Sequence, residues 1–435
     1  MDYSILDFGA KSGGDFLCTS AIQKTIDTCS ENGGGRVVVP SGKYLTGTIL
    51  LKSNVELHLE VGAHLLASPN LADYNKELVY PFNHKCSPEG WNEKHLIIAY
   101  NLENIAITGF GTIDGNADVF YGNKCKNNSL TKYVWRYGLA GAKDTVSLRP
   151  GQLICIIQCK NINISGVTMT GATCWTCYLH GCDFVQIKGI KIKNKNYHLN
   201  TDGVDIDVCR YVTLSDCVIL TGDDSIAIRG CGKAIGDETR ACEYITISNC
   251  VLSSSSSVFR IGVGTSPIKH VRISDIVAIS GAILANFYPE WAEVSHTDTE
   301  DVHFTNISAT DLGRVVEINV NNGTKVKNCS VTNVRAMAMA GPKLYSTSPN
   351  AVSDILLENI VQETIPDHRK DGLDANEWDT EGRTPAFTCL KGVNGLTIKN
   401  CKFNISKEIL STFERTIDIE NCANSNIEDC VFIKD

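Results

Sequence analysis

Short segments of alternating apolar and polar residues recur along the chain in one six-position pattern. The pattern reads apolar, any residue, apolar, any residue, then Gly, Asn or Asp, then an apolar residue or Cys. Successive copies are separated by 23, 27, 33, 26 and 31 residues, and they begin at Ile162, Val185, Val212, Ile245, Val271 and Val302. Other copies begin at Ile105, Ile355 and Leu396, and weaker ones end at Cys329 and Cys430. Periods of this length indicate a solenoid or another repeat array.

The fifth position, here called the bend position, decides which solenoid is expected. Its residues are of the three types that tolerate left-handed backbone angles: Gly109, Gly166, Gly189, Asp216, Asn249, Asp275, Asn306, Asn328, Asn359, Asn400 and Asp429. One such residue turns the chain sharply between two short strands. The sixth position should then point inward and stack on its counterparts about 4.8 Å away: Phe110, Val167, Ile190, Cys217, Cys250, Ile276, Ile307, Cys329, Ile360, Cys401 and Cys430. We therefore predict an all-β fold, a right-handed parallel β-helix.

The beginning of the chain departs from this pattern and predicts a capping helix. Ser20 can cap a helix that carries Ile22, Ile26 and Cys29 on one face and ends at Asn32. A solenoid needs such a cover at its open end. We expect a single domain over 1–435, with the cap at about 1–40 and polar loop excursions at 117–145 and 366–384.

Composition and charge narrow the classes of function. A net charge of −9, a pI of about 5.6 and the absence of a Lys/Arg block argue against nucleic-acid binding. No apolar run reaches membrane-spanning length, and no secretory signal is visible at the start. Most of the 19 cysteines lie in Val/Ile-rich strands, where a free thiol packs as a small hydrophobe. We expect a reduced, cytoplasmic protein, or a secreted one if a leader was removed.

Three aspartates carry the candidate chemistry. Asp202 lies in NTDGVD and Asp223 and Asp224 follow in GDD, so the two motifs are 21 residues apart, about one short coil. Neighbouring parallel strands are about 4.8 Å apart, which should bring the three carboxyls into one patch and raise the pKa of at least one of them. A protonated acid beside an ionised base is what glycoside hydrolysis requires. Ordinary turn residues and a Ca²⁺ site are the alternatives for these motifs.

NTDGVD followed by GDD on a β-helix resembles glycoside hydrolase family 28, the polygalacturonases and rhamnogalacturonases. The likeness extends to LDFGAK, GGGRVVVPSGKYLTG and IAITGFGTIDG. It implies that Asp223 protonates the leaving oxygen while Asp202 and Asp224 activate water, with inversion. It also implies that Asn200 and Asp205 hold the geometry of the motif or touch the sugar. No cofactor and no metal are expected.

Two basic motifs of that family have no counterpart here, and other residues become candidates for substrate binding. Where the family has Gly-His-Gly, this chain reads Ser256-Ser257-Val258, and no basic residue stands where the family has Arg-Ile-Lys. We expect Arg260 to replace the missing cations in part, because a guanidinium grips a carboxylate bidentately; a solvated arginine is the alternative. Further candidates for contact with the sugar are Arg229, His180, Tyr288 and Trp291. A buried, satisfied histidine is the alternative for His180, and simple packing is the alternative for the two aromatic residues.

Three functions remain open on the sequence. The first is an inverting glycosidase that trims ends of a pectin-type or related plant oligosaccharide, neutral or uronate, inside the cell. The second is a β-helix lyase or an intramolecular glycosyl transferase, whose products would be unsaturated or anhydro sugars. The third is a non-catalytic carbohydrate-binding solenoid. Turnover that disappears in Asp223→Asn would favour the first.

Overall fold

The computed structural model describes the chain except for residues 77, 78, 80–92, 122–148, 197, 291–294, 322, 349, 367–385 and 435. Most of both predicted excursions therefore lies outside the described residues. The chain forms two compact units, and the described residues up to Asp223 belong to unit 1 and those from Asp224 onward to unit 2. The single domain over 1–435 stays a prediction.

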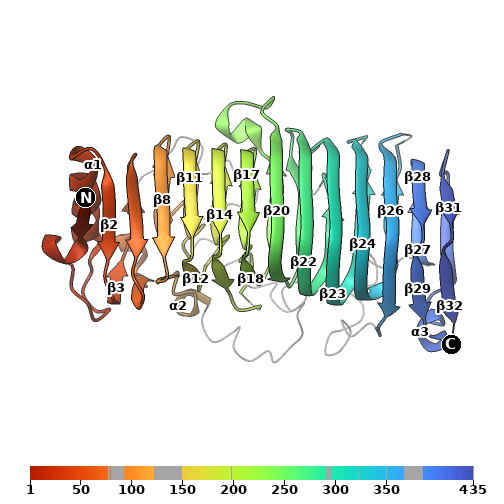
Figure 1. Cartoon of the computed structure of the whole chain (residues 1–435), viewed down its shortest axis with the longest axis horizontal. Helices are drawn as coiled ribbons and strands as arrows, with labels where there is room; N and C mark the ends of the chain where they lie inside the picture. Colours follow the sequence, from red (N-terminus) through yellow and green to blue (C-terminus); the bar gives the residue numbers. More distant parts are fainter. Residues whose placement is uncertain are drawn as a thin grey trace. The chain divides into compact units, whose positions relative to one another are not determined.

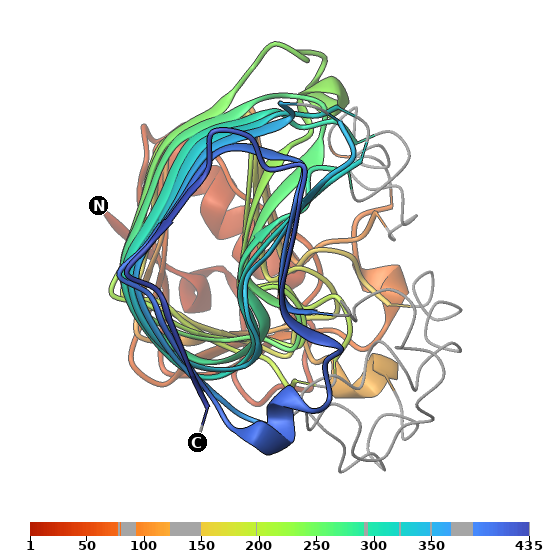
Figure 2. The same cartoon turned by 90° about the vertical axis from the view of Figure 1, so that its right-hand side faces the viewer.

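Unit 1 is a parallel β-helix whose coils each contribute up to three short strands (Figures 1 and 2). The first column of paired strands is β4 (Ile49–Leu50), β7 (Ile97–Tyr100), β10 (Ile154–Ile157), β13 (Cys177–His180) and β16 (Val204–Asp207). The second, next to β1 (Asp2–Ser4), is β2 (Gly35–Val39), β5 (Val55–Leu59), β8 (Glu103–Gly109), β11 (Lys160–Ser165), β14 (Asp183–Lys188) and β17 (Arg210–Ser215). The third is β3 (Gly42–Thr46), β6 (Ala63–Ala67), β9 (Thr112–Asp114), β12 (Thr168–Thr170), β15 (Lys191–Lys193) and β18 (Val218–Leu220).

Unit 2 has the same parallel pairing, with both long and short strands. They are β19 (Ile226–Gly230), β20 (Cys242–Ser253), β21 (Ser257–Gly264), β22 (Ile268–Phe287), β23 (Thr299–Val320), β24 (Val326–Ala340), β25 (Lys343–Ser346), β26 (Val352–Thr364), β27 (Ala386–Lys391), β28 (Val393–Lys399), β29 (Lys402–Ile405), β30 (Arg415–Glu420), β31 (Asn426–Glu428) and β32 (Val431–Lys434). A short helix, α3 (Lys407–Leu410), precedes β30. The predicted parallel β-helix is confirmed.

The bend positions explain why the chain winds in this way. Every residue predicted there has a positive φ, from 51° at Asp429 to 107° at Gly109. In unit 1 the copies lie in register, since Ile162 pairs with Ile105 and with Val185, and Val185 pairs with Val212. All four of these side chains are buried. The alternation of the sequence therefore becomes a stacked apolar core, one layer per coil.

One predicted inward residue is exposed, and a second is buried as predicted but occupies another position of the pattern. Phe110 is 72% exposed, because Thr112 pairs with Thr168 and so Gly111, not Phe110, lies opposite Val167. Phe110 is an extra residue pushed outward at that bend. Cys329 is buried but pairs with Ile355, at the first position of the pattern.

The bend of the Cys329 copy is consequently Asn333, with φ 54°, whereas Asn328 belongs to a second row of left-handed residues. Two such rows exist because each coil turns sharply more than once. The six-position pattern cannot tell the two rows apart here, because Asn328 precedes Cys329 and Asn333 precedes Val334, and both pairs fit its fifth and sixth positions.

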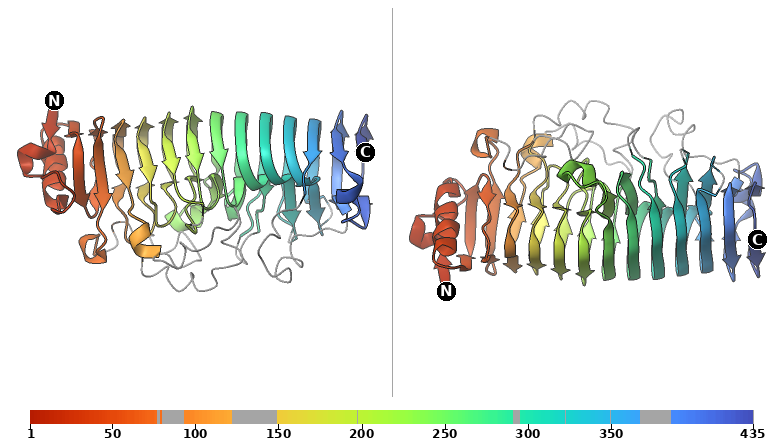
Figure 3. Two further views of the ribbon diagram at one scale, coloured as in Figure 1. Left: turned by 90° about the horizontal axis from the view of Figure 1, so that it is seen from below. Right: turned by 90° about the horizontal axis from the view of Figure 1, so that it is seen from above.

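The capping helix exists, but its first residue differs from the prediction. Helix α1 (Thr19–Glu31) begins after Cys18, so Ser20 lies inside the helix and does not cap it; the structure gives Cys18 no side-chain capping hydrogen bond. The predicted face is correct, with Ile22, Ile26 and Cys29 buried. The helix packs against β1, β2, β4 and β5 at the N-terminal end of unit 1 (Figure 3).

The cysteines behave as packing residues. Every cysteine in the described part of the chain is a free thiol, and most are buried, including Cys174 and Cys177. Burial raises the pKa of the Cys177 thiol far above its ordinary value, so it stays protonated. Among the helices that the structure describes, none is long and apolar enough to cross a bilayer.

A charged cluster on unit 2 predicts a pH-dependent stability. Asp301 accepts hydrogen bonds at 2.8 Å from His270 and His303 and at 3.0 Å from Arg272. Burial raises the pKa of Asp301, but these hydrogen bonds outweigh it and lower the pKa to about 2. A lowered carboxyl pKa stabilises the fold above the unfolded value, and the gain is lost as the pH falls toward the folded value.

We therefore expect Asp301→Asn to lower the free energy of unfolding by on the order of 2 kcal/mol at pH 7. The difference from wild type should stay constant down to about pH 5 and narrow between about pH 4 and 2. Urea unfolding midpoints across this range measure it. Asp354→Asn is the matched control, because Asp354 (φ 54°), like Asp301 (φ 59°), is a left-handed residue directly before a copy of the pattern. A difference that stays the same from pH 7 to pH 3 would contradict the assignment.

Candidate active site

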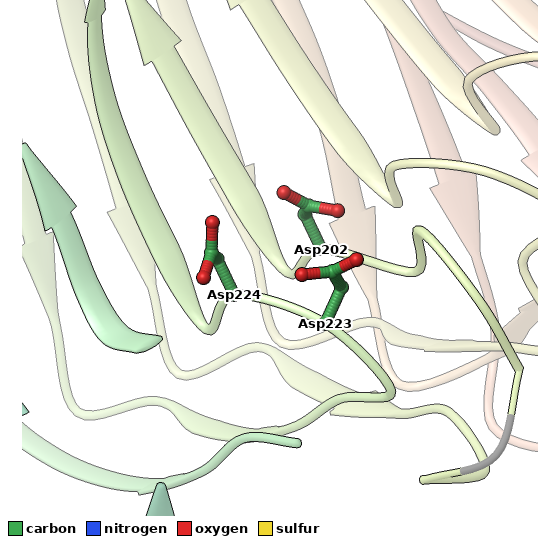
Figure 4. Close-up of side chains that lie close together, drawn as sticks. All are labelled: Asp202, Asp223 and Asp224. Atoms are coloured by element: carbon green, nitrogen blue, oxygen red, sulfur yellow. The ribbon is translucent and has the colours of Figure 1, made fainter. Parts of the chain in front are cut away.

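The three predicted aspartates lie together at adjoining turns (Figure 4). Asp202 lies just before β16, and Asp223 and Asp224 lie between β18 and β19. One carboxylate oxygen of each residue lies within 4.8 Å of those of the other two. Asp202, Asp223 and Asp224 are 4%, 8% and 6% exposed. The predicted convergence is thus observed, and it places three like charges where little water can screen them.

A threonine hydroxyl links the turn of Asp202 to the turn of Asp223. The Thr201 hydroxyl donates to the backbone oxygen of His198 at 2.7 Å and accepts the Gly222 N–H at 3.1 Å. Both flanking residues of the acids, Thr201 before Asp202 and Gly222 before Asp223, are therefore joined directly. This hydroxyl therefore links the two turns that carry the carboxylates of unit 1.

Gly222 is required by the closeness of that contact. A Cβ at this position would lie 2.1 Å from the backbone oxygen of His198 and 2.7 Å from both the Lys195 oxygen and the Thr201 hydroxyl. The Thr221 hydroxyl then donates to the backbone oxygen of Asp223 at 2.6 Å. The close packing of the two turns therefore requires glycine at the first position of the Gly-Asp-Asp motif.

The coil before Asp202 supports it through the backbone. The Thr176 N–H donates to the Asp202 carbonyl at 2.8 Å. Asn194 donates to the Thr176 hydroxyl at 2.7 Å and accepts the Ala172 N–H at 3.1 Å. Asn194 is 8% exposed, so this network is shielded from water and fixes the turn.

In unit 2, Asp224 contacts polar groups of the following coil. Its carboxylate accepts the Ser257 N–H at 2.8 Å, and an Arg260 guanidinium nitrogen lies 3.8 Å away. The Arg260 guanidinium also lies over the Tyr288 ring, 5.1 Å from its centroid. Asn286 donates to the Ser257 hydroxyl at 2.9 Å. Arg260 therefore has its guanidinium beside a catalytic candidate, which the notion of a solvated strand arginine does not predict.

The other predicted sugar-binding residues are placed less favourably. Asn200 accepts a hydrogen bond from Arg149 at 3.0 Å, which fits the geometry-holding role. Asp205, His180 and Arg229 are 0%, 0% and 5% exposed, and the ring of His180 packs near that of Tyr178. The burial of His180 gives its predicted contact with sugar no support. Trp291 lies outside the described residues.

The carboxylate cluster also has the donor set of a hard-cation site. Oxygens within 4.8 Å of one another can share one ion, since Ca²⁺–oxygen distances are about 2.3–2.6 Å. Asp202, Asp223 and Asp224 would then be the ligands. The cation site and the acid–base site would use the same atoms. A chelator should abolish activity if the carboxylates hold a required cation, and should leave activity unchanged if they act as acid and base.

Sequence comparison identifies the family. The sequence model of glycosyl hydrolases family 28 matches residues 29–354, well over half of the chain. The chain belongs to glycosyl hydrolases family 28. A probable polygalacturonase of Vitis vinifera is 31% identical over 291 residues, which cover 64% of this chain and 55% of that protein. An exo-poly-alpha-D-galacturonosidase of Dickeya chrysanthemi is 32% identical over 254 residues, 51% of this chain and 41% of that one.

This family 28 chain thus spans about half the length of those two relatives. Solved structures agree in fold. An exopolygalacturonase from Thermotoga maritima has a TM-score of 0.65 at 20% identity, covering 99% of this chain and 91% of that one. A family 28 exopolygalacturonase from Yersinia enterocolitica gives 0.61 at 17% identity, covering 100% and 78%.

Proposed function

We propose that this protein is a glycosidase that hydrolyses O-glycosidic bonds of a pectin-type oligosaccharide. The observation that carries the proposal is the cluster of three carboxylates within 4.8 Å of one another in a family 28 chain. Such a cluster cannot readily hold three negative charges, so one carboxyl should remain protonated beside ionised neighbours. That pairing supplies both an acid for the leaving oxygen and a base for water.

In the proposed reaction Asp223 protonates the glycosidic oxygen as the bond to the anomeric carbon breaks. Asp202 and Asp224 accept hydrogen bonds from one water molecule, which attacks the anomeric carbon from the opposite face. Two oxygens within 4.8 Å can both accept from a single water, because each O–H···O hydrogen bond spans about 2.8 Å. The proton that water loses passes to one of these carboxylates.

The separation of the carboxylates bears on the stereochemical outcome. With one acid and one nucleophile, separations of about 5–5.5 Å accompany retention and about 6.5–9.5 Å accompany inversion. Here one oxygen of each carboxylate lies within 4.8 Å of those of the other two, a closest approach below both ranges. We nevertheless propose inversion, because the third carboxylate lets a pair of oxygens hold the water between them. Proton NMR of the first product decides it: the anomer opposite to the substrate's is expected, and the same anomer would contradict the water-holding role.

A uronate-containing substrate is the most specific choice that the site supports. The relatives are described as polygalacturonases, and Arg260 lies 3.8 Å from Asp224 with its guanidinium against Tyr288. A guanidinium can bind a sugar carboxylate bidentately, and the Tyr288 ring can support a sugar face. We propose that Arg260 serves in place of the two basic motifs that the sequence lacks.

Arg260→Met should therefore lower kcat/KM on oligogalacturonides by roughly 10- to 100-fold, the value of a charge-assisted hydrogen bond. The same change should alter kcat/KM on carboxyl-reduced oligosaccharides by less than about threefold. Arg335→Met, at an exposed arginine of β24, is the control. An equal loss on both substrates would argue for a structural role and against uronate binding.

The remaining alternatives differ in their products. A screen over pectic and neutral oligosaccharides should yield new reducing ends if the protein is a hydrolase. Unsaturated or anhydro ends would indicate the lyase or transferase, and binding without turnover would indicate a carbohydrate-binding solenoid. Activity that requires Ca²⁺ and disappears with a chelator would favour the cation site over the acid–base reading.

We also propose that the protein works in the reduced, cytoplasmic environment that its cysteines suggest. Every described thiol is free, and most are buried in the core. Thiol titration of the denatured protein, purified without reductant, should recover all 19 cysteines. Recovery of markedly fewer would point to disulfides and an oxidising compartment.

A further inference from the structure

A buried arginine forms hydrogen bonds with the turn that carries Asp202. Arg149 is 1% exposed, and its Nη2 donates to the side-chain oxygen of Asn200 at 3.0 Å. Its Nη1 donates to the backbone oxygen of Leu199 at 3.0 Å and also contacts the Tyr121 hydroxyl and the Thr173 carbonyl. One guanidinium thus binds four oxygen atoms. Two of them belong to the residues two and three positions before Asp202.

Tyr121, which lies 28 residues before Arg149 in the sequence, contacts the same turn. Its hydroxyl donates to the Leu199 carbonyl at 2.5 Å, and its ring stacks on that of His198 with centroids 4.5 Å apart and planes 3° apart. Tyr121 is the last residue of α2 (Asp118–Tyr121). Tyr121 and Arg149 therefore bring two positions 28 residues apart in sequence against each other and against this turn.

His198, whose ring stacks on Tyr121, also contacts an acidic side chain of α2. Its Nε2 lies 3.2 Å from Asp118, which Lys195 also contacts at 2.6 Å. Burial lowers the pKa of His198 to about 4, so the ring is neutral at pH 7 and contributes by stacking and hydrogen bonding. The backbone oxygen of His198 in turn accepts from Thr201.

The result is that successive residues before Asp202 are each held. His198, Leu199 and Asn200 are bound by Tyr121 and Arg149, and Thr201 is bound to the turn of Asp223. Asn200 has a left-handed backbone, φ 57°, so the turn would otherwise have a ready alternative conformation. An arginine suits this task, because its planar fork of five N–H groups can serve several acceptors at once without losing its proton.

We infer that Arg149, together with Tyr121, is a positioning residue that holds Asp202 at the separation from Asp223 that hydrolysis needs. This inference rests on the proposed glycosidase function. It assigns a role to two residues outside both acidic motifs. Their contacts reach Asp202 through Leu199 and Asn200 and not through substrate, so they act on the turnover step and not on sugar binding.

Arg149→Met should reduce kcat by roughly 30- to 100-fold and leave KM within about twofold, because a displacement near 1 Å at a catalytic group costs about that much. Ethylguanidine should restore part of the activity of Arg149→Ala. Tyr121→Phe, which keeps the stacked ring and removes the hydroxyl, should cost less. The double variant should lose less than the product of the two single losses, because both residues act on one turn.

The control separates positioning from general loss of structure. The folded fraction of each variant is measured by thermal unfolding, and amide hydrogen exchange is measured for a peptide spanning residues 198–202. Faster exchange confined to this peptide, at an unchanged folded fraction, is expected. A kcat that is unchanged, or that falls only in proportion to the folded fraction, would overturn the inference. A rise in KM alone would also overturn it.

The exchange measurement distinguishes this inference from the proposed function. If wild type proves not to hydrolyse any oligosaccharide, the proposed function fails. Faster exchange at 198–202 in Arg149→Met would still show that Arg149 holds this turn in place. If wild type hydrolyses pectic substrates and Arg149→Met is as active, only the positioning role fails.

Discussion

Asp223→Asn is expected to lose hydrolytic activity by about 10²- to 10⁴-fold while its unfolding temperature stays within a few degrees of wild type. The amide cannot donate a proton to the glycosidic oxygen, so the bond must break without acid assistance. The shape of the side chain is kept, and the amide is as uncharged as the protonated carboxyl that it replaces, so the charge balance of the cluster and the fold should be kept. Initial rates of reducing-end formation from oligogalacturonides measure the loss.

A matched variant shows that the effect belongs to the site. Asp216→Asn makes the same chemical change on the coil between the two acidic motifs, at a left-handed bend residue with φ 61°. Asn occurs at equivalent bends, and the Asp216 contact with Lys188 at 3.9 Å is exposed, so activity should be unchanged. Substrates with an activated leaving group should suffer least from Asp223→Asn, since they need little protonation. Full activity of Asp223→Asn on an unactivated oligosaccharide would disprove the acid role.

Gly222→Ala is expected to be the most damaging small change in the site. The added methyl would lie 2.1 Å from the His198 carbonyl, a distance that real contacts do not reach. The turn before Asp223 must therefore move away from the turn before Asp202, and the hydrogen bond from Gly222 to Thr201 is lost with it. We expect kcat to fall by at least about 10²-fold, because the acid and base no longer share one geometry.

The comparison for Gly222→Ala is Gly189→Asn. Gly189 is a bend residue with φ 64°, and a Cβ there meets no atom within 4 Å. Asn occupies other bends of the chain at similar angles, so this variant should keep its activity. If Gly222→Ala does not fold, Thr201→Val tests the same link without adding an atom near the backbone. Wild-type kcat in Gly222→Ala or Thr201→Val would show that the two turns are placed independently.

The architecture could be predicted because its determinants are local. A left-handed residue after each short alternating strand turns the chain at a fixed point in every coil, so the predicted bends agree with the observed φ angles. The exceptions have local causes as well. Phe110 precedes Gly111, and either residue could take the inward place until the pairing of Thr112 with Thr168 selected the glycine. Asn328 and Asn333 are both left-handed, and only strand register tells which row each belongs to.

The catalytic candidates could be found from spacing, but their supports could not. Asp202 and Asp223 are one coil apart, so winding alone brings them together. Arg149 has no motif and follows a long polar stretch, and nothing in its neighbourhood in the sequence relates it to Asn200. The burial of His180 likewise depends on the side chains that surround it in space.

The sequence by itself therefore determined the solenoid, its bends and the meeting of the acidic motifs, because each follows from residue type and from one repeating distance along the chain. The tertiary structure alone decided how closely the carboxylates approach, which turn contacts fix them, and that Arg260 lies beside Asp224. The physical reason is that such distances depend on side chains from separate coils that compete for the same small volume. No periodicity along the chain encodes that competition.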